Sequence, residues 1–517
     1  MMQWFRFVKI KKDNQKQPNT PIPPQEQRTV SGCYQRDIAY LKKIFHDDDP
    51  IEFREMNTGA NGDIRACLIF CDGLVDSAII DNHLIRPLTQ LEKIPKGETP
   101  ADALLSKVFQ VNGVKKAESY NEIIQGITYG DTLLLIDGIS EALLFSTKCF
   151  TSRAVTEPEG EKIISGPREG FTEVMLSNLS LVRRKLRTDK LKMRYYTLGK
   201  QTNTQLCIAY LDGLADPEVL KELYRRLKLI DIDGILDANY INELIRDDAW
   251  SPFRSIGYTE RPDVVAAKLL EGRIAVFVDG TPVVLTLPYL FIENFQSSED
   301  YYLNFYYTSF CRGLRMLGFF LSIMVPAIYI AIVAYHQEML PAPLLISIAT
   351  ERQSVPLPAA LESFIMLIVF EILRETALRM QSNVGQALSI VGALVVGQAA
   401  VEAKLVAAPM IIVVALAGIT SLLVPKMNAS AFILRFGILL LASCLGFLGV
   451  TIGFAFLLTH ILGLRSFGIL QLAPDRKICY QEVKDTVIRA PWHQMLFRPV
   501  PIARNVVRQN NNREEQP

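Results

Sequence analysis

The sequence predicts an α/β soluble N-terminal region of two duplicated subdomains, followed by an α-helical polytopic membrane domain. Three observations lead to this prediction. Residues 316–461 hold 12 charged residues in 146, whereas the remaining 371 residues hold 97. The charge-poor segment contains several apolar runs of about 20 residues, the length that a membrane span needs. In the soluble half, two pairs of short motifs recur about 140 residues apart.

The overall composition excludes several classes of protein. The chain has 55 Lys and Arg against 54 Asp and Glu, a balance that argues against a nucleic-acid-binding protein with a basic surface. The eight Cys and five His include no C-x-x-C pair and form no zinc pattern. No catalytic dyad, nucleophile constellation or Gly-rich cofactor loop occurs. We therefore expect no metal, no cofactor and no enzymatic activity.

Residues 1–30 are expected to be a disordered tail. The first eight residues are apolar but short and interrupted by Arg6, and the stretch that follows is polar and rich in Pro. This pattern does not fit a signal peptide. The soluble part is therefore expected to stay on the side of the membrane where it is made.

The duplication is read from four motifs in the soluble half. RACLIFCDGLVD at residues 65–76 matches QLCIAYLDGLAD at 205–216, an offset of 140. GDTLLLIDG at 130–138 matches GRIAVFVDG at 272–280, an offset of 142. Because the order and the offset both hold, we expect one α/β subdomain at residues 31–150 and a second at 194–311.

Each copy contains the same predicted elements. An apolar strand ends in Asp-Gly, a helix follows (77–88 or 217–229), and a further strand reaches a second Asp-Gly before a last short strand (141–146 or 281–287). Asp216 is placed to cap the second of these helices, with Pro217 in its first turn. Metal or phosphate chemistry is one interpretation of the Asp-Gly pairs. We favour the other, in which Gly adopts the turn geometry and Asp bonds its own backbone.

Residues 151–193 are predicted to connect the two subdomains. They begin with a Pro-broken extended stretch ending in GPREG and continue with a helix over 171–191. That helix is rich in basic residues. Either it touches anionic head groups or a partner subunit, or it is a solvated face. The interface candidates in this segment are Arg168, Arg183, Arg184 and Arg187.

The membrane domain is predicted at residues 312–464, with a cytoplasmic tail at 465–517. Three runs are clear span candidates, at 317–335, 405–424 and 436–459, and two weaker ones lie at 359–380 and 384–400. Basic residues flank both ends of the domain, so both termini are expected to be cytoplasmic. Two cytoplasmic ends require an even number of crossings. We therefore expect four crossings and one short re-entrant or interfacial helix within residues 359–400.

Charged residues inside the first weak segment are the first set of candidates for function. Charges in a membrane are costly and indicate a functional site. The alternative is a self-neutralising interfacial helix, because Arg374 and Arg379 are spaced to pair with the acidic residues at helical distances. Glu362 is expected on the opposite side from the others. The set comprises Glu362, Glu371, Arg374, Glu375 and Arg379.

A stripe of small residues marks the second weak segment. Gly385, Ser389, Ala393 and Gly397 recur every four residues, which is typical of close helix packing. The alternative is that this face, or the adjoining one with Val396 and Ala400, lines a narrow path formed by several copies of the chain.

At these residues the chain resembles the A subunits of the nutrient germinant receptors of spore-forming Firmicutes, the GerA family. The resemblance extends from about residue 63 to residue 492. It depends on four further stretches besides RACLIFCDGLVD: SGPREGFTEVMLSNLSLVRRKLR, the block from VPLPAALESF to APMIIVVAL, LRSFGI, and DTVIRAPW. The block from VPLPAALESF to APMIIVVAL is long and specific.

The resemblance implies a multi-pass protein of the spore inner membrane. It implies assembly with a transporter-like B subunit that senses the nutrient and with a lipoprotein C subunit. It also implies a homo-oligomeric ring, a pentamer, that conducts cations when the nutrient binds. In the channel hypothesis that follows, the path would use Ser389, Ala393, Val396, Gly397 and Ala400, with Glu371 and Arg374 as a charged mouth or gate. Val395 or Val396 could close the path by dewetting.

Two other functions remain open from the sequence. The chain is either this channel subunit or a non-conducting scaffold or transducer that docks the B and C subunits. A secondary transporter in its own right would show an inverted repeat in the membrane half, and the sequence has none that we detect.

Overall fold

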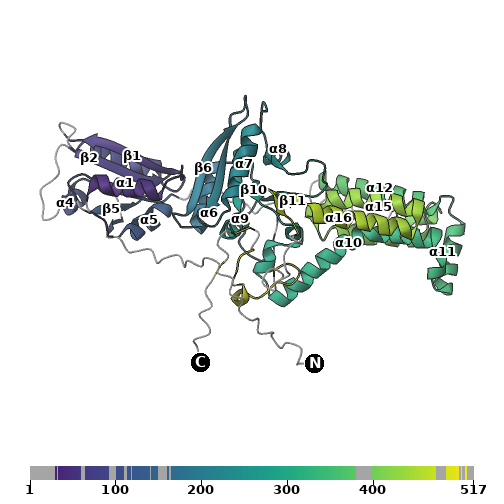
Figure 1. Cartoon of the computed structure of the whole chain (residues 1–517). Coiled ribbons are helices and arrows are strands. Elements are labelled where there is room, and N and C mark those ends of the chain that lie inside the picture. The colour runs from purple at the N-terminus through teal and green to yellow at the C-terminus, as the bar shows by residue number, and fades with distance from the viewer. Residues whose placement is uncertain are drawn as a thin grey trace, which may run out of the picture. The chain divides into compact units, whose positions relative to one another are not determined.

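A computed structural model of the chain contains two five-stranded antiparallel sheets, a set of apolar helices and a two-stranded sheet of β11 (Arg465–Ser466) and β12 (Ile469–Leu470) (Figure 1). It describes residues 29–31, 33–59, 64–91, 100–109, 113–117, 119–139, 141–149, 160–161, 163, 165–379, 397–472, 485–495, 497–499, 502–503 and 507–508. The chain divides into two units. Unit 1 is Met1–His46 with Ile51–Cys149, and unit 2 is Asp47–Pro50 with Phe150–Pro517.

Unit 1 contains the first sheet, in the order β1-β2-β4-β5-β3. Every neighbouring pair in it is antiparallel. Apolar side chains of β2, β4 and β5 on one face of the sheet form a core with the helical stretch that follows β2. The elements are α1 (Tyr34–Ile44), β1 (Ile51–Thr58), β2 (Ile64–Cys71), α2 (Ser77–Ile79), the π-helix η1 (Ile80–Ile85), α3 (Arg86–Thr89), α4 (Pro100–Lys107), β3 (Val114–Ala117), α5 (Tyr120–Thr128), β4 (Asp131–Ile136) and β5 (Ala142–Ser146).

Unit 2 begins with the second sheet, in the order β6-β7-β9-β10-β8, again antiparallel throughout. Helices α6 and α9 pack on one face and α7 and α8 on the other, so alternate strand residues enter two separate cores. The elements are α6 (Met175–Lys185), β6 (Leu191–Leu198), β7 (Thr204–Leu211), α7 (Pro217–Leu229), α8 (Ala238–Ile245), β8 (Gly257–Thr259), α9 (Pro262–Leu270), β9 (Ile274–Val278) and β10 (Val284–Leu287).

The two sheets confirm the predicted duplication. Both have the same strand order, and equivalent backbone bonds recur in both. The amide of Asp137 donates to the carbonyl of Arg65 at 2.8 Å, and that of Asp279 donates to the carbonyl of Gln205 at 3.0 Å.

The Asp-Gly pairs are turns, as predicted. Gly73 and Gly213 have φ values of +80° and +77°, which favour glycine because a Cβ is disfavoured there. Asp216 caps α7 by accepting a hydrogen bond from the Glu218 amide at 3.0 Å. These residues therefore have a structural role that needs no ligand.

The basic helix belongs to the second copy and does not connect the copies. α6 precedes β6 as α1 precedes β1, so it is the first helix of the repeat. The helix ends at Lys185, and β6 begins at Leu191, which shortens the predicted helix over 171–191. The subdomain boundary that we predicted after residue 193 falls inside β6, so the second subdomain begins earlier and includes α6.

The helical part follows two short 3-10 turns, η2 (Phe291–Phe295) and η3 (Ser298–Tyr301). Among the described residues, α10 and the stretch Pro425–Leu445 are long and apolar enough to cross a membrane. Helices α14 and α16 are apolar but shorter. The helices are α10 (Phe305–Tyr335), α11 (Ala342–Gln353), α12 (Ala359–Arg379), α14 (Ala408–Ser421), α15 (Asn428–Leu445) and α16 (Phe447–Gly463).

The prediction of one span over 436–459 is wrong. Gly446, with φ +61°, breaks this run into α15 and α16, which pack as an antiparallel hairpin. Both open ends of the hairpin touch one loop of the second α/β subdomain: Ser430 Oγ donates to the carbonyl of Pro252, and Ser251 Oγ lies 3.0 Å from His460 Nε2. A hydropathy profile does not detect such a break, because the residues on both sides of Gly446 are apolar.

Replacing Gly446 by Ala is expected to destabilise the helical part by about 1–3 kcal/mol. A Cβ at this position would lie 2.9 Å from Tyr335 Cγ, and the backbone conformation is one that L-residues rarely adopt. Gly437→Ala is the matched control, because a Cβ there meets no atom within 4 Å and replaces a glycine inside α15. Thermal unfolding of the purified variants in detergent is the measurement. Equal unfolding temperatures for the two variants would contradict the hairpin.

Candidate functional site: two buried charge networks

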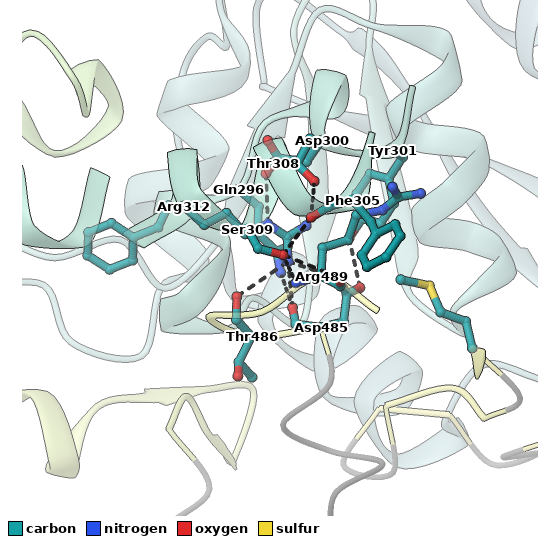
Figure 2. A network of polar contacts seen from close by, with 12 residues as sticks. Gln296, Asp300, Tyr301, Phe305, Thr308, Ser309, Arg312, Asp485, Thr486 and Arg489 are labelled. Atoms are coloured by element: carbon teal, nitrogen blue, oxygen red, sulfur yellow. Dashed lines mark hydrogen bonds and ion pairs between the residues drawn. The ribbon is translucent and has the colours of Figure 1, made fainter. Parts of the chain in front are cut away.

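A buried charge network joins the start of α10 to the rest of unit 2 (Figure 2). We call Asp300, Arg312, Arg315 and Asp485 the junction network. Arg312 Nε donates to Asp300 Oδ2 at 2.8 Å, and its Nη1 donates to Asp485 Oδ1 at 2.9 Å. Arg315 binds both oxygens of Asp300 at 2.9 Å. The network links η3, α10 and a tail segment that lies more than 170 residues after α10 begins.

The pKa values of the two carboxyl groups in the junction network are shifted in opposite directions. Burial would raise the pKa of Asp300, but the hydrogen bonds and charges of Arg315 and Arg312 outweigh it and lower that pKa. At Asp485 burial outweighs the attraction of Arg312 and raises the pKa of the carboxyl. The same arginine therefore pairs with one carboxylate whose pKa is lowered and with another whose pKa is raised.

The rest of the DTVIRAPW motif binds beside this network. Arg489 is buried; its amide donates to Ser309 Oγ at 3.1 Å and its Nη1 donates to the carbonyl of Leu303 at 3.1 Å. The Trp492 ring lies 5.9 Å from that of Tyr301. The motif therefore binds residues 301–309, around the start of α10.

The LRSFGI motif binds the second α/β subdomain directly after α16. Ser466 Oγ accepts a hydrogen bond from the Tyr289 amide at 2.9 Å and donates to the carbonyl of Ser255. The amide of Phe467 donates to Asp247 Oδ2 at 2.6 Å. The helical part thus begins and ends at the same subdomain.

A second network lies within the helical part. We call Glu371, Arg374 and Arg435 the helix network. Arg374 pairs with Glu371 at 2.5 Å across one turn of α12, as the spacing predicts. Arg435 of α15 is buried, lies 3.3 Å from the other Glu371 oxygen, and donates from Nε to the carbonyl of Ser322 at 2.7 Å. The network therefore joins α10, α12 and α15.

Glu362 has a separate set of partners, as the prediction of opposite sides requires. It is fully buried, and its Oε1 accepts a hydrogen bond from the Ala407 amide at 2.6 Å, just before α14. Arg352 at the end of α11 lies 3.3 Å from its other oxygen. This carboxylate joins α11, α12 and the start of α14.

Glu375 and Arg379 form the predicted pair at 2.7 Å, but this pair is exposed. Their side chains are 59% and 78% exposed at the end of α12. Within one copy of the chain they are therefore not part of either buried network.

The predicted pore residues lie largely outside the described residues. This applies to Ser389, Ala393, Val395 and Val396. Gly397 is buried, and a Cβ added to it would lie 3.8 Å from Ile411, so this glycine faces α14. Ala400 is half-buried and packs against the core that contains α12 and α14.

The basic interface candidates separate into one buried residue and three outer ones. Arg183 is buried and pairs with Asp48 at 2.5 Å. It therefore stabilises the interior of unit 2 and does not form an outward-facing interface. Arg184 lies 3.9 Å from Glu169, and Arg187 Nε donates to the carbonyl of Arg184. Arg168 is exposed. Among the described residues no group of three His, Cys, Asp or Glu is placed to hold a metal ion.

Sequence reasoning missed Arg352, Arg435, Asp300 and Asp485. The first two sit at the edges of apolar runs, where they look like flanking charges. The available signal was composition: Arg435 is one of only 12 charged residues in the apolar segment, so it needed a partner there. Spacing along the chain does not give that partner, which is 64 residues away.

The comparisons with known proteins identify the family. A family model described as Bacillus/Clostridium GerA spore germination protein matches residues 39–500. The chain belongs to this family. The GerA resemblance inferred from the motifs is confirmed, and with it a role in spore germination.

Two similar proteins match nearly the whole chain, and one solved structure matches half of it. Spore germination protein KA of Bacillus subtilis (strain 168) is 40% identical over 491 residues, which is 94% of this chain and 90% of that protein. An uncharacterized membrane protein of the same strain, YfkQ, is 39% identical and covers 98% of both chains. The crystal structure of the N-terminal domain of the A subunit of the Bacillus megaterium spore germinant receptor GerK3 is 33% identical. It covers 51% of this chain and 98% of that one, with a TM-score of 0.41.

Proposed function

We propose that this GerA protein is the A subunit of a nutrient-responsive receptor and that several copies form a nutrient-gated cation channel in the spore inner membrane. Copies would assemble as a ring of five, with a transporter-like B subunit and a lipoprotein C subunit as partners. Both termini would be cytoplasmic. The helical part agrees with this topology, because α10 binds the segment that follows β10 and the residues after α16 bind the same α/β subdomain.

One observation carries the channel proposal. The outer face of α12 is apolar at Ile365, Ile368 and Ile372, and then ends in the exposed pair of Glu375 and Arg379. Such a pair needs water or another protein beside it. A ring that encloses a water-filled path supplies both. α12 also leads directly into residues 384–400, which the small side chains mark as a closely packed or path-lining segment.

The buried networks give this path a rigid frame. Glu362 is fully buried and Glu371 is partly buried, and each contacts at least one other helix. Buried charge in an apolar surrounding is tolerated where it is paired and hydrogen-bonded. The networks therefore hold α10, α11, α12, α14 and α15 in one arrangement, and gating is left to residues 384–400.

The test is cation flux across liposomes that contain the assembled complex of A, B and C subunits, with nutrients added. We expect nutrient-dependent flux in the wild type and flux without nutrient in Val396→Ala, which removes the apolar closure. Gly397→Leu is expected to abolish flux, because a side chain of that size has to displace Ile411.

Gly437→Leu is the matched control for the last variant. It adds the same side chain to a helix of the same domain, at an exposed position with no atom within 4 Å of a Cβ. Flux should persist in this variant. A verified complex that stays silent across a broad nutrient panel would favour the non-conducting scaffold that docks the B and C subunits.

A further inference from the structure

A large apolar side chain stands out from the loop that connects α8 to β8. Trp250 is 95% exposed. The loop is nevertheless ordered by its own hydrogen bonds: the Trp250 amide donates to Asp248 Oδ1 at 3.0 Å, and Arg246 Nε donates to the carbonyl of Asp248 at 2.6 Å. The backbone of Trp250 is thus held in place by the loop.

The same loop is attached to two helices of the apolar part. Ser251 Oγ lies 3.0 Å from Nε2 of His460, in the last turn of α16. Ser430 Oγ, near the start of α15, donates to the carbonyl of Pro252, and the Phe253 ring lies 5.8 Å from that of His460. Trp250 therefore lies beside the two helix ends that face the α/β subdomain.

The apolar outer surface of the helical hairpin extends to this level. Phe456, one turn before His460, is 70% exposed, and the two rings stack at 6.5 Å. Ile433 of α15, less than one turn after Ser430, is 55% exposed. Of the two neighbouring carboxylates, Asp247 pairs with Arg226 at 2.7 Å and Asp248 Oδ1 accepts a hydrogen bond from the Trp250 amide.

We propose that Trp250 anchors the second α/β subdomain at the membrane surface, with its indole in the head-group layer of the bilayer that surrounds α15 and α16. The inference rests on the proposed function in one respect, that these helices lie in a membrane. Tryptophan favours the membrane–water interface because its ring is apolar and its N–H finds a polar partner there. A loop fixed to the ends of two apolar helices places the ring at that depth.

The anchor would add a third contact to those that hold the second α/β subdomain at the helices. The region before α10 is bound to that helix through Asp300, which pairs with Arg312 and Arg315, and the loop of Ser251 and Pro252 is bound to α15 and α16. An indole in the head-group layer adds a contact with lipid and limits tilting of the subdomain against the membrane plane.

The test uses the intrinsic fluorescence of the full chain in liposomes. The chain has three Trp, at positions 4, 250 and 492. Replacing Trp4 and Trp492 by Phe leaves Trp250 as the single emitter, and replacing Trp4 and Trp250 leaves Trp492 as the matched control. Lipids brominated near the head group quench only indoles in the interface, and acrylamide quenches those in water.

We expect blue-shifted emission and strong loss of Trp250 fluorescence with brominated lipid. We expect much weaker loss for Trp492, a tail residue whose ring lies 5.9 Å from that of Tyr301. Quenching of Trp250 by acrylamide alone would place it in water and overturn the anchor. Protection from both quenchers would mean that protein covers it, which also overturns the anchor.

Flotation with the liposomes and cation flux separate this inference from the proposed function. If the chain floats and conducts but Trp250 is in water, only the membrane anchor is contradicted. If the chain floats with Trp250 in the lipid interface but never conducts, only the channel is contradicted. If the chain does not float with liposomes, both proposals are contradicted.

Discussion

Glu371→Leu is expected to destabilise the helical part by about 3–5 kcal/mol, because it leaves a buried Arg435 without its carboxylate. Arg435 is fully buried and its counter-charge comes from another helix. Loss of one member of a buried pair costs more than the pair contributes, since the remaining charge stays desolvated. The measurement is the thermal midpoint and the folded yield of the purified protein in detergent.

Two comparisons make the Glu371 experiment specific. The double variant Glu371→Leu with Arg435→Met should recover most of the loss, because an apolar pair replaces a buried ionic one without a stranded charge. Glu375→Leu is the matched control: it removes the same side chain from the same helix, but from an exposed pair whose contribution is about 0–1 kcal/mol. A single variant at Glu371 as stable as the control would show that the helix network does not hold α12 and α15 together.

Arg312→Met is expected to have the second large effect, again about 3–5 kcal/mol, at the junction network. Arg312 is fully buried and binds Asp300, the side chain and carbonyl of Asp485, and the carbonyl of Thr486. Asp300 retains Arg315, so the tail is the part that loses its partner. We therefore expect residues 485–495 to detach from α10.

Limited digestion with trypsin measures this detachment. Arg489 is buried in the wild type and becomes a cleavage site once the tail leaves. Mass spectrometry should find cleavage after Arg489 in Arg312→Met well before it appears in the wild type. Arg225→Met is the control, because it removes an arginine whose pair with Glu222 lies on the surface. Equal cleavage rates in the two variants would refute the role of Arg312 as the tail's main contact.

The features predicted well from the sequence are those with a local cause. The two copies share strands that end in Asp-Gly, and a glycine at φ near +80° leaves its mark in the sequence because few other residues adopt that conformation. The helix over 217–229 was found for the same reason, since Asp216 and Pro217 mark its start. The pairs of Glu371 with Arg374 and of Glu375 with Arg379 also follow from helical spacing.

The features that were missed depend on contacts between distant parts of the chain. Arg183 looked like part of a basic surface, but Asp48, 135 residues earlier, places it in the interior of unit 2. The single span expected over 436–459 is a hairpin, because Gly446 turns the chain within an uninterrupted apolar run. The junction network joins residues 173 positions apart, and no periodicity in the sequence reports such a contact.

Current recording from the complete receptor tests the central claim most directly. The purified A, B and C subunits would be placed in a planar bilayer with a cation gradient, and nutrients added to one side and then the other. The account predicts stepwise unitary currents that appear only with nutrient, and currents without nutrient in Val396→Ala. A correctly assembled receptor that binds nutrient and shows no unitary current in either form would contradict a channel and leave the chain as a scaffold.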